Sequence, residues 1–187
     1  MMRILTGKYK GRRIKMPGGL RPTQDKVRKA LFDILGGLEG LSFLELFSGT
    51  GAVGIEALSQ GAKEAVFVEN NRSCLRILED NLSSLAPDAQ HPTPVAYHLL
   101  PMDSSLAIRK LAKKRFRFDI IFMDPPYYQD IAKKTLQILG ACDILAPNGF
   151  IVVQHFKKEN LPAELGDLTL FKQSRYGDTA LSFYRKK

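Results

Sequence analysis

Long apolar runs are missing from this sequence, and cysteine is scarce. No apolar run reaches the length of about 18 residues that a membrane-spanning helix needs, so we expect no membrane segment. The first residues lack the apolar stretch of a secretory signal peptide. Cys74 and Cys142 are the only cysteines, which favours free thiols in a reducing compartment over a disulfide framework. These absences together predict a cytoplasmic protein.

Histidine is also scarce, and the histidines His91, His98 and His155 are scattered along the chain. Metal-binding histidines and cysteines usually recur at short, regular spacings, and these three residues do not. We therefore expect no metal site.

Negative charge is almost missing from the N-terminal segment. Residues 1–29 contain ten Lys and Arg and one acid, Asp25, whereas residues 30–187 contain eighteen charges of each sign. The net charge of +9 therefore belongs to this segment. Its sequence "RILTGKYKGRRIKM" has the pattern of two short strands around a turn. A basic hairpin suits a polyanion, of which nucleic acid is the commonest, and a solvated tail is the alternative.

We accordingly divide the chain into a basic N-terminal hairpin at residues 1–20, which we expect to bind RNA, and a second domain at residues 21–187. A further basic cluster at residues 109–117 is expected on a helix, where a solvated surface is the simpler interpretation. The cations expected to contact RNA are Lys8, Lys10, Arg12, Arg13, Lys15, Arg21 and Arg28.

Helical and extended apolar patterns alternate after the hairpin, which predicts an α/β fold with a parallel sheet. Thr23 can cap the first helix, and Gly36 can end it. The last two strands are expected to form a hairpin around the turn at residues 176–178. The expected strands are residues 42–47, 64–69, 95–100, 118–123, 150–156, 168–173 and 179–185, and the helices after the first lie near residues 52–60, 71–85, 104–115 and 129–140.

Polar or glycine residues follow each of the first four expected strands, at the sheet edge where ligands of such folds bind. Gly49, Gly51 and Gly54 follow the first strand in a GxGxxG pattern, which is typical of nucleotide sites but also of plain tight turns. Glu69 ends the second strand, where a carboxylate can accept hydrogen bonds from ribose hydroxyls of nicotinamide and nucleoside cofactors alike. Asp103 follows the third strand and could accept from an adenine amine, which favours S-adenosylmethionine.

The fourth strand ends in Asp124-Pro125-Pro126-Tyr127, which a rigid loop alone would explain. The alternative is a pocket for an amine on a nucleobase. A carboxylate and a proline carbonyl that accept the two amine hydrogens would draw the nitrogen toward tetrahedral geometry and free its lone pair for attack on a sulfonium methyl. A base splayed out of its stack could lie on the ring of Tyr127.

The stretches "GLRPTQDKVRKALFDIL", "ELFSGTGAVGIEALSQGA", "FVEN" and "FDIIFMDPPY" together resemble the bacterial family that methylates N2 of a guanine in small-subunit (16S) ribosomal RNA. The resemblance runs from "RILTGKYKGRRI" to "YGDTALSFY", nearly the whole chain. It implies a class I S-adenosylmethionine-dependent methyltransferase fold with a seven-stranded sheet whose last strand is antiparallel. It also implies that the helix starting at Thr23 closes over the methionine end of the cofactor, where a helix N-terminus attracts a carboxylate.

The resemblance places the target amine at the catalytic residues Asp124, Pro125, Pro126 and Tyr127, and the cofactor ribose at Glu69. The sequence departs from the family pattern at Glu45, where aspartate is usual, at Ser48, where alanine is common, and at Gln154, where glutamate is expected. The last departure argues against a role for a carboxylate at that position. The expected cofactor-binding residues are Thr23, Glu45, Phe47, Ser48, Gly49, Thr50, Gly51, Glu69, Asn70, Asp103 and Ser104.

The resulting hypothesis is a monomeric methyltransferase that uses S-adenosyl-L-methionine to modify guanine N2 in ribosomal RNA or in the small ribosomal subunit. A DNA adenine-N6 methyltransferase can share the Asp-Pro-Pro-Tyr loop, but a separate target-recognition domain is not evident in 187 residues. A non-catalytic RNA-binding chaperone would use the basic hairpin and leave the four strand-end patterns unexplained.

Overall fold

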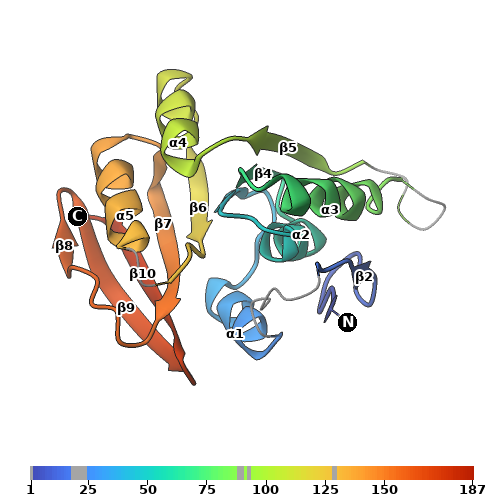
Figure 1. The fold of residues 1–187 in the computed structure, drawn as a ribbon, viewed down its shortest axis with the longest axis horizontal. Helices are drawn as coiled ribbons and strands as arrows, with labels where there is room; N and C mark the ends of the chain where they lie inside the picture. Colours follow the sequence, from blue (N-terminus) through green and yellow to red (C-terminus); the bar gives the residue numbers. More distant parts are fainter. Residues whose placement is uncertain (1, 18–24, 88–90, 92–93, 128–129) are drawn as a thin grey trace.

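An eight-stranded sheet forms the centre of the molecule (Figure 1). The computed structural model describes residues 2–17, 25–87, 91, 94–127 and 130–187. The strand order is β5-β4-β3-β6-β7-β10-β9-β8, and the five strands from β5 to β7 are parallel. The strands are β3 (Ser42–Leu46), β4 (Glu64–Glu69), β5 (Ala96–Pro101), β6 (Phe118–Met123), β7 (Leu145–Phe156), β8 (Glu164–Leu165), β9 (Leu168–Tyr176) and β10 (Thr179–Lys186).

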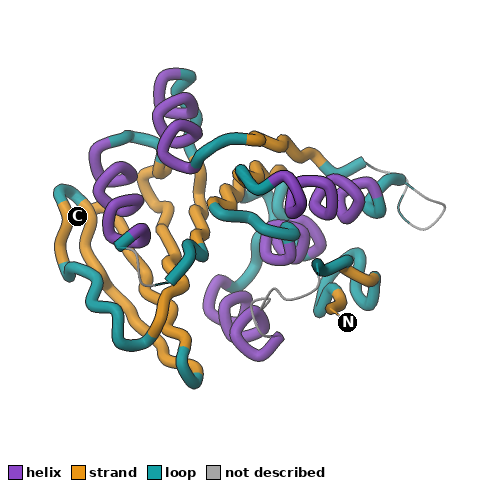
Figure 2. Tube along the Cα trace, viewed as in Figure 1, coloured by secondary structure: helices purple, strands orange, loops and turns teal. Residues whose placement is uncertain are grey.

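Helices cover both faces of the sheet (Figure 2). Three of them, α1 (Asp25–Leu35), α2 (Ala52–Ser59) and α3 (Arg72–Ser83), share a core with one face. The other face packs against α4 (Ser104–Lys113) and α5 (Ile131–Ala141). Successive residues of β6 alternate between the two cores, with Ile120 and Phe122 on one side and Ile121 and Met123 on the other. A strand buried on both faces reads as the continuous apolar run seen in the sequence.

The expected fold class is confirmed, because β10 runs antiparallel between β7 and β9 and closes the terminal hairpin. Two details differ from the sequence-based expectation. The two-residue strand β8 extends the sheet beyond the seven expected strands. β7 begins at Leu145 instead of residue 150, because Leu145 pairs with Phe118 ahead of a shift in register.

The basic N-terminal segment forms the predicted hairpin from β1 (Met2–Arg3) and β2 (Arg13–Ile14), which pair antiparallel. Its apolar side chains Met2, Ile4, Tyr9 and Ile14 are buried in the same core as α1, α2 and α3. The hairpin is therefore packed against the sheet domain. No helix among the described residues is long and apolar enough to cross a membrane.

Candidate active site

The chain turns sharply between β3 and α2, as the glycine pattern predicts. Phe47, Gly49 and Gly51 have φ angles of 57°, 54° and 77°, in the left-handed region. Glycine adopts this region at little cost, whereas a phenylalanine there is uncommon and marks a constrained backbone. Gly51 ends the turn and caps the N-terminus of α2.

The three glycines of the pattern have different surroundings. A Cβ atom on Gly51 would lie 2.3 Å from the Leu78 side chain, and one on Gly54 would lie 2.4 Å from the Phe67 ring. Neighbouring side chains therefore leave no room for a Cβ atom at Gly51 or Gly54. A Cβ atom on Gly49 would meet no atom within 4 Å. The backbone at Gly49 therefore borders open space, which is the position where a ligand can approach the turn.

Glu69 lies at the end of β4 beside this turn. Its Oε2 atom accepts a hydrogen bond from the Gly49 backbone N–H at 2.7 Å. Its Oε1 atom accepts from the backbone N–H groups of Asn70 at 2.9 Å and Asn71 at 2.7 Å. These bonds fix the carboxylate at the edge of the sheet, next to the open side of Gly49. Asn70 itself is exposed.

Glu45 lies in β3, and its Oε2 atom accepts a hydrogen bond from the Gly54 backbone N–H at 2.9 Å. Burial raises the pKa of Glu45 to about 8; backbone bonds from Gly54 and Val53 oppose the rise, and the charges of Asp124 and Glu69 add to it. Carboxylates from three neighbouring strands are therefore close enough to interact, as the sheet order predicts. Glu45 itself is buried behind the turn, where it supports the start of α2.

Asp124 directly follows β6 and is partly buried, with Pro125 buried behind it and Pro126 exposed. Its Oδ2 atom accepts a hydrogen bond from Nε2 of Gln154 on β7 at 2.8 Å. Gln154, which departs from the family pattern, is thus a direct partner of the loop aspartate. A neutral amide supplies a donor here without adding a charge.

Tyr127 is partly buried, and its ring centroid lies 6.3 Å from that of Phe156. Burial raises the pKa of Tyr127, and side-chain hydrogen bonds with Thr179 and Gln154 oppose this rise. Asp124 and Tyr127 therefore both contact Gln154. The loop brings a carboxylate and an aromatic ring together at the end of β6. Tyr128 and Gln129 lie outside the described residues.

Several of the expected cofactor-binding residues have side chains that bond with other parts of the protein. Ser48 is buried, and its hydroxyl is hydrogen-bonded to the carbonyls of Glu45 and Val68. Thr50 is buried, and its hydroxyl donates a hydrogen bond to the sulfur of Met16.

Asp103 is exposed and caps α4 by accepting from the backbone N–H groups of residues 105 and 106. Ser104 is buried at the start of α4, and Thr23 lies outside the described residues.

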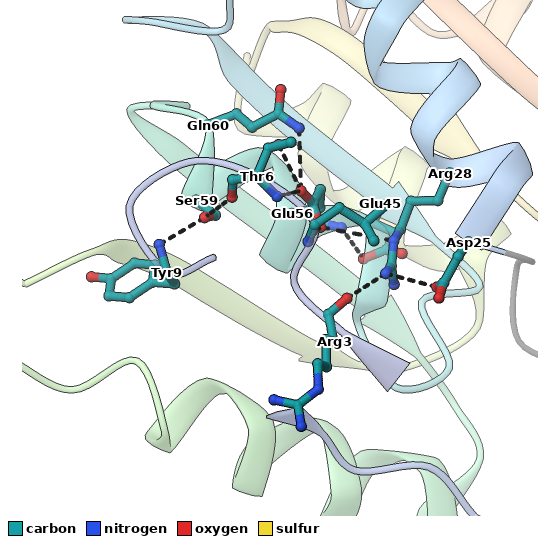
Figure 3. Close-up of polar contacts among 11 residues, drawn as sticks. Arg3, Thr6, Tyr9, Asp25, Arg28, Glu45, Glu56, Ser59 and Gln60 are labelled. Atoms are coloured by element: carbon teal, nitrogen blue, oxygen red, sulfur yellow. Dashed lines mark hydrogen bonds and ion pairs between the residues drawn. The ribbon is translucent and has the colours of Figure 1, made fainter. Parts of the chain in front are cut away.

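Glu56 on α2 anchors the N-terminal hairpin (Figure 3). Its carboxylate accepts hydrogen bonds from the backbone N–H groups of Leu5 and Thr6, both at 2.8 Å, and from the Thr6 hydroxyl at 2.9 Å. The neighbouring Ser59 hydroxyl accepts from the Tyr9 N–H at 2.9 Å and donates to the Thr6 carbonyl at 2.6 Å. Side chains of α2 thus bind the backbone of the hairpin.

Arg28, which was expected to contact RNA, has a side chain that is 0% exposed in this structure. Its Nη2 atom donates to the Arg3 carbonyl at 2.5 Å and to Asp25 at 3.0 Å, and its Nε atom lies 3.8 Å from Glu56. Burial lowers the pKa of Arg28, while the charges of Glu56, Asp25 and Glu45 raise it. Arg28 therefore joins α1 to the hairpin and to α2 (Figure 3).

The remaining hairpin cations divide into two groups. Arg12 donates to the Ser84 carbonyl at 2.6 Å and lies over the Tyr9 ring at 4.6 Å, and Lys15 pairs with Asp80 at 2.8 Å. These two side chains tie the hairpin to the end of α3. Arg21 lies outside the described residues, and Lys8, Lys10 and Arg13 are exposed on the hairpin.

Sequence reasoning did not identify two polar residues that organise this region, Glu56 and Asn81, and it noted Gln154 only as a departure from the family pattern. The Asn81 side chain binds the backbone of Lys15 in the hairpin and the carbonyl of Thr50 in the glycine turn. A signal was present for Glu56 and Asn81, because each is a polar residue on the apolar face of a helix. Among the described residues, no group of three or more His, Cys, Asp or Glu could hold a metal ion.

Comparisons with known proteins cover nearly the whole chain. A curated protein of Escherichia coli strain K12, named ribosomal RNA small subunit methyltransferase D, is 31% identical over 100% of this chain and 90% of its own length. The protein of the same name from Haemophilus influenzae is 29% identical over 98% of this chain and 93% of its own. A solved structure of a hypothetical protein from Thermus thermophilus has a TM-score of 0.84 at 32% identity, covering 99% of each chain.

The family model described as "Conserved hypothetical protein 95" matches residues 2–185. This range includes the N-terminal hairpin, the glycine turn and the Asp124–Tyr127 loop. The chain therefore belongs to this family, which includes the small-subunit ribosomal RNA methyltransferase D.

Proposed function

We propose that this protein transfers a methyl group from S-adenosylmethionine to the exocyclic N2 amine of a guanine in small-subunit ribosomal RNA. The observation that carries the proposal is the position of the loop from Asp124 to Tyr127. The loop follows β6, which is the neighbour of β3 in the sheet. The glycine turn follows β3 and is hydrogen-bonded to Glu69 of β4. The names of the curated relatives support ribosomal RNA as the substrate.

The residues around Gly49 fit the cofactor. The open space at Gly49 admits a ligand against the backbone, and the Glu69 carboxylate at this edge has the chemistry to accept ribose hydroxyls. S-adenosylmethionine would supply a methyl group on a sulfonium, which is already an activated donor. The protein's task is then to position the amine, and positioning alone can account for a large part of such catalysis.

Asp124 and its neighbours suit an amine acceptor. The ionised carboxylate can accept one amine hydrogen and the Pro125 carbonyl the other, which orients the nitrogen lone pair. Tyr127 offers a ring face for a base that has left its stack, an interaction worth roughly 1–3 kcal/mol. The charges of Asp124 and Glu69 both act on Glu45 between them, and negative charge at this edge suits a cationic methyl donor.

Guanine fits Asp124 better than adenine does. Guanine presents two neighbouring donors, N1–H and the N2 amine, whereas adenine presents an amine beside an acceptor. A carboxylate has about four acceptor sites on two oxygens, so Asp124 can keep its bond with Gln154 and still receive both guanine donors. Adenine N1 would instead face an oxygen lone pair.

Methyl transfer from labelled S-adenosylmethionine tests the reaction and its substrate together. The purified protein is incubated separately with small-subunit ribosomal RNA, with small ribosomal subunits lacking the modification, and with DNA. We expect label in the RNA or in the subunits and none in DNA. Label in DNA alone would support an adenine-N6 enzyme, and RNA binding without label in any substrate would support a chaperone.

A further inference from the structure

We propose that Gln154 is a positioning residue for methyl transfer, which holds Asp124 and Tyr127 in the arrangement that receives the target base. This inference rests on the proposed function. Neither the strand-end pattern nor the glycine turn includes Gln154, which belongs to the strand beside the catalytic loop.

The backbone of Gln154 is fixed on both sides. In the parallel pairing of β6 and β7, Met123 is opposite Val153, so Gln154 is the residue of β7 next to Asp124. On the other side, Gln154 is opposite Leu181 of β10. The residue is only 4% exposed. A side chain in the interior of a paired, buried strand can hold a loop residue more firmly than another loop residue could.

The Gln154 side chain contacts both functional side chains of the loop. Its Nε2 atom donates to Oδ2 of Asp124 at 2.8 Å, and the amide lies close enough to Tyr127 to oppose the rise in the pKa of that hydroxyl. Fixing Oδ2 fixes the plane of the carboxylate and thereby the direction in which Oδ1 accepts. The second contact restrains the ring whose face would carry the base. One buried amide thus sets the orientation of both groups.

The amide is suited to this role because it carries no charge at any relevant pH. The charges of Asp124 and of Glu69 on β4 already act on Glu45 of β3, and Glu159 after β7 acts on Tyr127. The next residue, His155, contacts the Phe156 carbonyl and Ser182 instead. Gln154 is therefore the donor to Asp124 at the β7 edge, and an acid at the same position would share a proton with the aspartate.

Two substitutions test the inference by single-turnover methylation of small-subunit ribosomal RNA at saturating cofactor. Gln154→Met keeps the size and removes the donor, and should slow transfer by roughly 10- to 100-fold, as expected for losing a hydrogen bond to a charged group. Cofactor affinity should stay unchanged. Gln173→Met is the matched control, because it removes a side-chain amide bond to Ser182 between β9 and β10, and should transfer at the wild-type rate.

Gln154→Glu gives a readout that a merely structural role would not move. At low pH the Asp124–Glu pair holds one proton and the new acid donates as the amide does, so the rate should approach that of the wild type. As pH rises and the pair loses this proton, the rate of the variant should fall while the wild-type rate does not.

The outcomes separate this inference from the proposed function. Failure of the wild type to methylate any RNA substrate overturns the proposed function and the inference together. An active wild type with an equally fast Gln154→Met variant overturns the inference alone. So does a Gln154→Glu variant with the wild-type pH profile, or a Gln173→Met variant that loses as much activity as Gln154→Met. Thermal unfolding of each variant verifies that the compared proteins are folded.

Discussion

Three carboxylates meet at the carboxyl edge of the sheet, and each has a different partner. Glu45 is buried and accepts from the backbone of α2, Glu69 accepts from the glycine turn, and Asp124 accepts from Gln154. Their residue type and strand positions were predictable from sequence, because the ends of parallel strands lie together. Their partners were not predictable, since Gln154 is 30 residues from Asp124 along the chain.

Glu69→Ala should weaken binding of S-adenosylmethionine by roughly 2–3 kcal/mol, because it removes charge-assisted hydrogen bonds to the ribose. Isothermal titration calorimetry on folded protein measures this change. Glu64→Ala is the matched control, because Glu64 begins the same strand at the opposite edge of the sheet. Equal affinity of the Glu69→Ala variant and the wild type would remove Glu69 from the ribose site.

Glu45 should make stability depend on pH. Its folded-state pKa of about 8 lies above the ordinary value of 4.5, so the folded protein keeps a proton that the unfolded chain has lost. The stability that this proton provides is complete below pH 4.5 and is lost as pH rises toward 8, with a limiting slope of about 1.4 kcal/mol per pH unit.

Glu45→Gln removes the titration, so its free energy of unfolding should fall less steeply between about pH 5 and 8. Urea unfolding of both proteins across this range gives the two slopes. Parallel slopes would mean that Glu45 is ionised in the folded protein at neutral pH, against the present account of its burial.

The N-terminal hairpin is the element whose attachment to the rest of the fold was least predictable from the sequence. Its charge pattern predicted an RNA-binding arm, which stays a prediction. Its turn residues predicted two short strands, and their pairing is confirmed. Its attachment was not predictable, because Glu56 lies about 50 residues from the backbone N–H groups that it binds. The start of β7 was missed for a local reason: Pro147 and Gly149 are typical of loops, and here they lie within the strand.

Glu56→Ala should lower the free energy of unfolding by roughly 3–5 kcal/mol, because it leaves the buried Arg28 guanidinium without its carboxylate partner on α2. Chemical unfolding provides the measurement. Asp33→Ala is the control: it breaks the exposed Lys29–Asp33 pair on α1 and should cost no more than about 0.5 kcal/mol. Similar losses for both variants would contradict the anchoring role of Glu56.

The two basic clusters of the sequence lie on the N-terminal hairpin and on α4, two elements that stand apart on the fold (Figure 1). The excess charge belongs to the hairpin segment, whereas the chain beyond it is balanced. Deleting the hairpin would be a poor test of its role, because the deletion would also remove apolar side chains from the core. Substitution of its exposed cations leaves the core intact.

The combined Lys8→Gln, Lys10→Gln and Arg13→Gln variant should bind ribosomal RNA with a flatter salt dependence. Each lost phosphate contact lowers the log–log slope by roughly 0.7–0.9, while binding of S-adenosylmethionine stays unchanged. The matched control replaces Lys110, Lys113 and Lys114 on α4 and the following turn with Gln, the same change in charge on the other cluster. A slope that falls in the control and not in the hairpin variant would assign RNA binding to α4.

The identity of the methylated nucleoside tests the central claim most directly. Single-turnover methylation of small-subunit ribosomal RNA is run with the wild type and with Asp124→Asn, and the product is digested to nucleosides. The account predicts methyl on guanine N2, with Asp124→Asn losing roughly 2–4 kcal/mol of transition-state stabilisation at nearly unchanged cofactor affinity. Methyl on adenine N6, or an Asp124→Asn variant as fast as the wild type, would contradict it.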